Sequence, residues 1–189
     1  MSATTFIDFA NRLSPLSEEA KIDLMASIST KTHPKGSLLL KEGDTCRHLY
    51  FIQEGLVKLC FNREDKEFIM RFFPEGALFT LLDSYLNQLP ATYEIIALEA
   101  TTVTMIRNTV MEALCRKHHT IETFFRKLIS TAALNMMDRV SELLEENATT
   151  RYAHFVAANS ALLQRISLGD LANYLGITQV SLSRIRAKK

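Results

Sequence analysis

The spacing of apolar residues changes along the chain, and each spacing predicts a different kind of element. Residues 3–30 predict two short helices, separated at Ser14-Pro15, with Ser17 as the cap of the second. From His33 onward, short runs rich in β-branched, aromatic and leucine residues are bounded by glycine-containing turns. The predicted strands span residues 37–41, 49–52, 56–62, 68–73, 92–98 and 102–106. Strands at such even spacing indicate an antiparallel barrel or sandwich.

No strand pattern returns after Asn108. Residues 120–146 carry apolar side chains at helical spacing over about seven turns. Because one small barrel cannot cover so long a helix, its remaining stripe predicts a partner helix from a second copy of the chain. Packing on its own chain alone is the alternative. The predicted dimer residues are Ile121, Phe125, Leu128, Ala132, Met136 and Val140. We expect residues 148–151 to interrupt the helix and another helix to span about 152–164.

Composition and charge narrow the class of protein. The 189 residues are 47% hydrophobic and 23% charged, which is typical of a folded chain of one or two domains. The net charge of +1 is uneven: from Gln164 onward, five cations and one anion give +4, which leaves −3 for the remainder. A basic end on a neutral body suggests a local contact with a polyanion, and a solvated C-terminus is the alternative.

Cysteine spacing and hydropathy indicate a cytoplasmic protein. Cys46, Cys60 and Cys115 are scattered and lack CxxC spacing, so we expect reduced thiols and neither a disulfide framework nor a zinc site. No stretch approaches the roughly 18 apolar residues of a membrane span. We therefore expect no membrane partner and no bound metal.

The segment 168–186 has the pattern of a DNA-binding helix-turn-helix. In this motif, a tight turn holds two helices at a steep angle, so that packing constrains several positions. Gly176 stands where the turn favours a positive φ, and the hydroxyl of Thr178 is placed to cap the second helix. Ala172 is small where the helices approach closely. The positions expected in the helix core are Leu171, Leu175, Ile177, Leu182 and Ile185.

The second helix of this motif offers polar and basic side chains for DNA. Gln179 suits adenine, Val180 suits a thymine methyl, and Arg184 suits guanine or phosphate. The predicted DNA-binding residues are Thr178, Gln179, Val180, Ser181, Ser183, Arg184, Arg186 and Lys188. A jelly-roll metalloenzyme would need clustered His and carboxylate ligands on neighbouring strands, which are lacking. We therefore expect no catalytic residues and no enzymatic activity.

Taken in order, strands, long helix and helix-turn-helix resemble the Crp/Fnr family of bacterial regulators. The resemblance rests on Gly43 and Gly55 in "LLLKEGDTCRHLYFIQEGLVKLCF", on Gly76 in "FFPEGALF", and on "ALEATTVTMI". It implies an α+β fold: an antiparallel β-roll, or double-stranded β-helix, with flanking helices, then a long dimerisation helix and a small all-α helix-turn-helix domain. The implied domains are 1–118, 119–147 and 148–189. It further implies a transcriptional regulator that binds DNA as a homodimer, with RNA polymerase and an unidentified small-molecule effector as additional candidate partners.

The resemblance fails at the cyclic-nucleotide cassette of the family. The Gly-Glu pair that holds the ribose becomes Thr80-Leu81, and the Arg-Ser/Thr pair that holds the cyclic phosphate becomes Ala91-Thr92. A phosphate without its arginine loses a contact worth about 1.5–3 kcal/mol. We therefore do not expect cyclic AMP to bind, and the effector is unknown. An apolar ligand, or the pocket's own side chains, would fill the space lined by Phe79, Thr80, Leu81, Leu82, Tyr85, Leu86, Ala91, Thr92 and Tyr93.

Other sensing chemistries of the family also lack their residues. Iron–sulfur members use clustered N-terminal cysteines, whereas the first cysteine here is Cys46, and the histidines match haem ligands by type alone. Family members usually continue into a β-hairpin wing, whereas this sequence stops at Lys189, so we expect fewer phosphate contacts and more dependence on dimerisation. The alternative function is a ligand-binding or protein-interaction module of the same fold that no longer binds DNA.

Overall fold

The computed structural model describes residues 5–64 and 66–187, and it begins with the two predicted helices. Helix α1 spans Phe6–Leu13 and α2 spans Glu18–Ala26. Thr5 and Asp8 form a capping box at the start of α1, and the Ser17 hydroxyl accepts the Ala20 amide of α2 at 3.3 Å. These local hydrogen bonds satisfy helix amides that would otherwise lack partners, and the predicted cap at Ser17 is confirmed.

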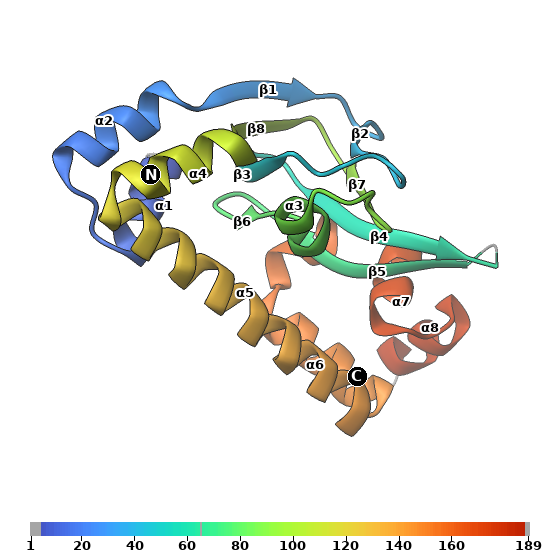
Figure 1. Ribbon diagram of the computed structural model, residues 1–189. Coiled ribbons are helices and arrows are strands. Elements are labelled where there is room, and N and C mark those ends of the chain that lie inside the picture. The colour runs from blue at the N-terminus through green and yellow to red at the C-terminus, as the bar shows by residue number, and fades with distance from the viewer. Residues whose placement is uncertain (1–4, 65, 188–189) are drawn as a thin grey trace.

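Two four-stranded antiparallel sheets form the β-roll (Figure 1). One has the order β1 (Ser29–His33), β8 (Thr101–Arg107), β3 (His48–Glu54) and β6 (Leu78–Phe79). The other has the order β2 (Leu38–Leu40), β7 (Glu94–Ala97), β4 (Val57–Arg63) and β5 (Lys66–Phe73). The predicted α+β fold is confirmed. Sequence reasoning missed β1 because four of its five residues are exposed, and missed β6 because it is two residues long.

The remaining helices follow or interrupt the strands. They are α3 (Leu82–Asn87), α4 (Asn108–Lys117), α5 (His119–Glu145), α6 (Ala148–Ala158), the 3-10 helix η1 (Ser160–Gln164), α7 (Leu168–Leu175) and α8 (Gln179–Ala187). The expected interruption of the long helix is present, but it lies at residues 146–147 and not at 148–151. The Asn147 side chain accepts the amides of Thr149 and Thr150, each at 3.0 Å, and caps α6. The helix expected to reach Gln164 ends at Ala158 instead.

Two apolar clusters hold the described residues together. The first lies between the sheets and includes α1, α2, α4 and the first half of α5. The second joins the outer face of β4 and β5 to α6, η1, α7 and α8, so the C-terminal helices share a core with the β-roll (Figure 1). The division into domains at residues 118 and 147 stays a prediction.

Gly55 permits the closest backbone approach in the β-roll. Its φ is +100°, and a Cβ added there would lie 2.5 Å from Thr101 Oγ1 and 2.7 Å from the Ala100 carbonyl oxygen. Gly36 also has a positive φ, +79°, but nothing lies within 4 Å of its Cβ position. Comparing alanine substitutions at the two glycines therefore separates the cost of a positive φ from the cost of steric exclusion.

We expect Gly55→Ala to destabilise the protein more than Gly36→Ala. Both variants force a non-glycine residue into the left-handed region, at a cost of about 1–2 kcal/mol. Gly55→Ala adds overpacking against backbone atoms, typically about 1–3 kcal/mol more. Urea unfolding of both variants measures the difference, and equal unfolding free energies would contradict the close approach.

Candidate effector cavity and DNA-binding helices

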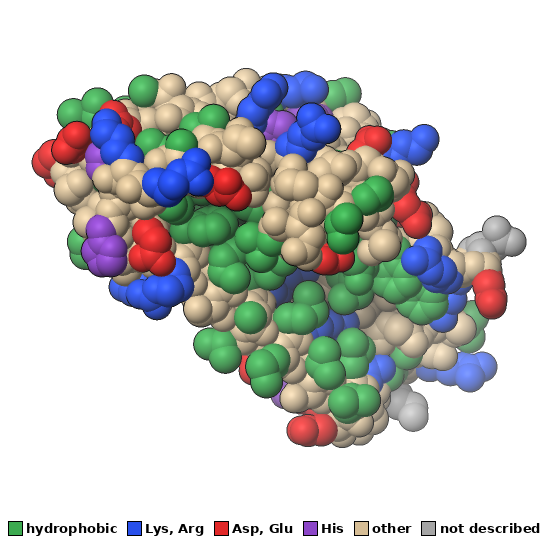
Figure 2. Space-filling view, viewed as in Figure 1, with side chains coloured by type: hydrophobic (Ala, Val, Ile, Leu, Met, Phe, Trp, Pro, Cys, Tyr) green, Lys and Arg blue, Asp and Glu red, His purple; other side chains and the backbone are tan. Residues whose placement is uncertain are grey.

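A cavity of about 780 Å³ lies between β5, α3 and α5. Figure 2 shows the hollow on the surface, with hydrophobic side chains along its border. It brings together seven residues predicted for the pocket, namely Phe79, Thr80, Leu81, Leu82, Ala91, Thr92 and Tyr93. The other two are placed elsewhere: Tyr85 is buried in the core at 1% exposure, and Leu86 is 48% exposed. Both residues belong to α3, and the helix turns their side chains away from the cavity.

Helix α5 supplies one wall of this cavity. Leu128, Ala132 and Met136, which the sequence predicted for the dimer interface, line the cavity of their own chain. Ile121 is fully buried, and Phe125 packs on Tyr85 with ring centroids 6.2 Å apart. The burial of Ile121 and Leu128, at 0% and 7% exposure, corrects the prediction at these two positions, since a long helix has room for more than one apolar face. The dimer contacts of Phe125, Ala132 and Met136 stay predictions. Of the six, Met136 and Val140 are exposed, at 46% and 49%, and Val140 lies outside the cavity lining.

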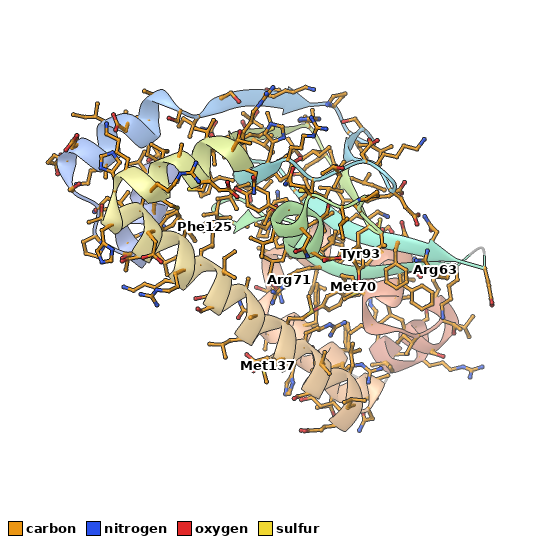
Figure 3. The ribbon with its side chains drawn as sticks, viewed as in Figure 1. Arg63, Met70, Arg71, Tyr93, Phe125 and Met137 are labelled. Atoms are coloured by element: carbon orange, nitrogen blue, oxygen red, sulfur yellow. The ribbon has the colours of Figure 1, made fainter. Side chains whose placement is uncertain are left out.

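A β-bulge places two consecutive β5 residues on the cavity side. Leu59 pairs with Arg71 while the next residue, Cys60, pairs with Ile69, so Met70 is the extra residue. A bulge breaks the alternation of side chains, and both Met70 and Arg71 line the cavity. Figure 3 shows Arg71 and Met70 between β5 and α5. Sequence reasoning missed both residues because strict alternation assigns neighbours to opposite faces.

The cassette positions contribute little polarity to this cavity. Leu81 and Ala91, which stand where the family has Glu and Arg, are 6% and 4% exposed. The Thr80 hydroxyl is already engaged, donating to the His48 carbonyl oxygen at 2.9 Å. These contacts leave the exposed Thr92 as the polar side chain at the position where the family pattern holds the phosphate.

Helices α7 and α8 form the helix-turn-helix. Gly176 has a φ of +70° in the turn between them, and Thr178 Oγ1 accepts the Ser181 amide at 3.1 Å. Leu171, Leu175 and Leu182 are at most 3% exposed where the helices meet. The predicted positive φ, the cap and the apolar contacts of the turn are thus all present.

One face of α8 points to solvent. Gln179, Val180, Ser183, Arg184 and Arg186 are exposed. Ser181 differs from the prediction because its half-buried hydroxyl accepts a hydrogen bond from Thr178 at 3.0 Å, within the cap. The predicted contact Lys188 lies outside the described residues.

A half-buried ion pair attaches α7 to β4. Lys58 Nζ lies 2.8 Å from Asp170 Oδ1 and 2.7 Å from Glu67 Oε1, and Asn173 donates to Glu67 at 3.1 Å. Burial acts to raise the pKa of Asp170, but hydrogen bonds from Lys58 and Ser167 outweigh it, and the pKa is lowered. Likewise burial acts to lower the pKa of Lys58, but its two carboxylate partners raise it. Both groups are therefore held in their charged forms.

Two arginines connect the end of α7 to the preceding helices. Arg139 of α5 is 9% exposed, donates to the Tyr174 carbonyl oxygen at 2.5 Å and lies 4.0 Å from the Tyr174 ring centroid. Arg151 of α6 donates to the Leu175 carbonyl oxygen at 3.0 Å. Carbonyls at a helix C-terminus lack helical partners, so these side chains satisfy them and fix the turn before α8.

The comparisons with known proteins agree with this architecture. The cyclic nucleotide-binding domain family matches residues 30–118. The fumarate and nitrate reduction regulatory protein of Vibrio cholerae is 26% identical over 181 residues, which cover 88% of this chain and 72% of that protein. The c-di-GMP responsive global regulator CLP of Xanthomonas campestris superposes with a TM-score of 0.73 at 15% identity over 91% of both chains. A structure from Eubacterium rectale assigned to the Crp/Fnr family gives 0.71 at 16% identity, covering 90% of this chain and 82% of that one.

The chain is similar over most of its length to transcriptional regulators of the Crp/Fnr type. The resemblance inferred from the glycine turns and the helix-turn-helix is thus confirmed, and the relatives reported above are regulatory proteins. The chain has the β-roll, the long helix and the helix-turn-helix in the order that the sequence predicted. Its departure from the cyclic-nucleotide cassette lies in the side chains that line the cavity.

Outside these two sites, the described residues hold one cluster of metal-ligand type. Glu19, Asp23 and His118 converge, but Lys117 Nζ lies 2.6 Å from Asp23 and already supplies the positive charge. Hydrogen bonds from Lys117 and then His118 lower the pKa of Asp23. Within the described ranges, no helix is both long and apolar enough to cross a membrane.

We expect Lys58→Met to loosen α7 from the β-roll. The variant leaves Glu67 and Asp170 half-buried without their cation, which costs about 1–3 kcal/mol. Hydrogen exchange of the α7 amides should rise, whereas Lys31→Met, at an exposed position of β1, should leave it unchanged. Equal exchange in both variants would contradict the attachment.

The same ion pair predicts a pH dependence. Because the pKa of folded Asp170 is lowered, its stabilisation is complete above the unfolded pKa of about 3.9 and is lost as pH falls through the folded value. Protection of α7 should therefore decline in acid before that of the β-roll core. Lys58→Met should remove this difference.

Proposed function

We propose that this regulator is a homodimer that binds specific DNA sequences through α8 and responds to an effector other than cyclic AMP. The observation that carries the proposal is the exposed face of α8, held by a packed helix-turn-helix. A recognition helix must present side chains to the major groove while its other face stays in the core. Leu182 meets the second requirement and Arg184 the first.

The residues of α8 divide into base-reading and phosphate-binding roles. We assign Gln179, Val180 and Arg184 to base edges, and Thr178, Ser183 and Arg186 to phosphates. The Gln179 amide nitrogen lies over Gly169, 3.0 Å from where a Cβ would stand, so it must swing outward to reach a base. Ser181 keeps its predicted role only if the cap with Thr178 opens.

The second half of α5 supports a dimer. Met137, Val140 and Leu144 are 67%, 49% and 80% exposed, and their spacing of three and four residues puts them on one face. Figure 2 shows hydrophobic side chains gathered along the solvent side of this helix. Exposed apolar stripes at this spacing are typical of helix pairs, and two copies would bring two recognition helices to one DNA site.

The effector would act through structure shared by both sites. One face of β4 and β5 lines the cavity, and the other packs on the C-terminal helices. A ligand that shifted these strands would therefore move α7 and with it α8. Cyclic AMP lacks its two charged anchors here, which is why we propose a different ligand.

We expect Arg184→Ala to weaken binding to a selected DNA site by about 1–3 kcal/mol if Arg184 reads guanine, with relaxed preference at that base pair. If it holds phosphate instead, affinity should fall uniformly and the salt slope should shrink by about one. Gel shifts against sites selected from random DNA measure both. The control is Lys31→Met, because Lys31 is exposed on β1, far from α8 in the sequence.

A combined Gln179→Ala and Arg184→Ala variant separates this function from its alternative. Both side chains are exposed, so the variant should fold as the parent does. Unchanged binding to the selected site would exclude α8 as a DNA reader. A parent protein that selects no sequence at all would favour an interaction module without DNA binding.

We expect Met137→Glu combined with Leu144→Glu to convert the dimer into a folded monomer. Two carboxylates on the stripe would be desolvated against the partner helix, at a cost of several kcal/mol. Sedimentation velocity measures the change, with Ile22→Glu, at a 67% exposed position of α2, as the control. If parent and double variant sediment alike, this face of α5 is not the interface.

A further inference from the structure

The size of the cavity and its lining point to a ligand with a large apolar part. Its volume of about 780 Å³ falls within the usual range for small-molecule sites, about 300–1,000 Å³. Apolar side chains from three elements converge there, including Phe73 and Phe79, whose stacked rings lie 3.9 Å apart. Leu128 and Met136 close the opposite wall. A wholly polar ligand would leave this surface in contact with water.

Arg71 brings a positive charge into that apolar lining. The β5 bulge turns it to the cavity side, and it is half-buried there. Within the described part of the chain, Arg71 forms no ion pair. A half-buried cation beside an apolar cavity favours an anionic partner that also has apolar surface.

The other charged groups of the lining are already engaged. Arg139 pairs with Glu142 at 2.5 Å and donates to Tyr174. Asp83 is exposed and accepts a hydrogen bond from Asn87 at 2.7 Å. On its far side Arg71 borders a polar cavity of about 380 Å³ whose lining includes Asp138 and Glu142, and neither carboxylate lies within ion-pair distance of it. One available guanidinium matches one carboxylate in charge and in its two-pronged geometry.

We propose that the cavity binds an amphipathic monocarboxylic acid, with the carboxylate on Arg71 and the apolar chain between β5 and α5. This ligand class rests on the effector role proposed above and names its chemistry. Arg71 lies on the strand whose outer face packs on the C-terminal helices, so the carboxylate would bind next to the connection to α7. The apolar chain would contact Leu128 and Met136 on α5.

Calorimetric titration with decanoate, decan-1-ol and decylamine tests this proposal, with cyclic AMP as a further comparison. Decanoate should bind more tightly than the alcohol and the amine of equal length, and cyclic AMP should not bind. Arg71→Met should weaken decanoate about tenfold or more and abolish its advantage over decan-1-ol. Arg63→Met should leave both affinities unchanged, since Arg63 is exposed and lies outside the lining.

Ala132→Trp provides a second test, because a large side chain on this wall should exclude the chain of every probe. Equal affinities for decanoate and decan-1-ol, no decanoate binding, or an unchanged affinity in Arg71→Met would each overturn the proposal. Tighter decanoate binding by the Met137→Glu, Leu144→Glu monomer would show that a second copy occupies the cavity, and would also overturn the proposal.

DNA binding is measured separately on the same protein. DNA binding without decanoate binding rejects this ligand class alone, and decanoate binding without DNA binding rejects the regulatory function alone.

Discussion

The pair of strands β4 and β5 is the element on which both sites depend, because it is packed on both faces. Leu59, Met70 and Arg71 face the cavity, while Cys60, Ile69 and Phe72 contact the C-terminal helices. A sheet covered on both faces cannot move on one side without disturbing the packing on the other, since protein interiors are close-packed. The β-roll and the helix-turn-helix are thereby joined by a direct contact.

Charged groups fix the orientation of α7 on these strands. The Lys58 ion pair fixes α7 on the strands, and Arg165 bridges Glu75 at 2.7 Å and Glu99 at 2.5 Å beside it. Apolar packing tolerates sliding, whereas a half-buried ion pair with hydrogen-bonded partners requires a defined geometry. Arg139 extends the connection to α5, because its guanidinium donates a hydrogen bond to the Tyr174 carbonyl oxygen in the last turn of α7. The orientation of α8 thus depends on β4, β5 and α5 together.

The long helix shows why one apolar pattern can serve several contacts. Its first half buries Ile121 and Phe124, its middle lines the cavity, and its second half exposes Met137 and Leu144. The sequence predicted a single dimer stripe, because a helical period reports which residues share a face and not what covers that face. Burial within the chain places Ile121 and Leu128 in its own core, whereas Met136 and Val140 stay exposed.

The sequence by itself determined the elements whose signals are local. The Ser17 cap, the positive φ of Gly176 and the Thr178 cap depend on neighbouring residues, so they could be predicted without knowing the fold. Seven cavity residues were also found, since they lie in two short segments, 79–82 and 91–93. Only the tertiary structure placed Arg71 in the cavity and Lys58 against Asp170. The first needs a bulge that breaks strand alternation, and the second joins residues 112 positions apart, so no local pattern reports either contact.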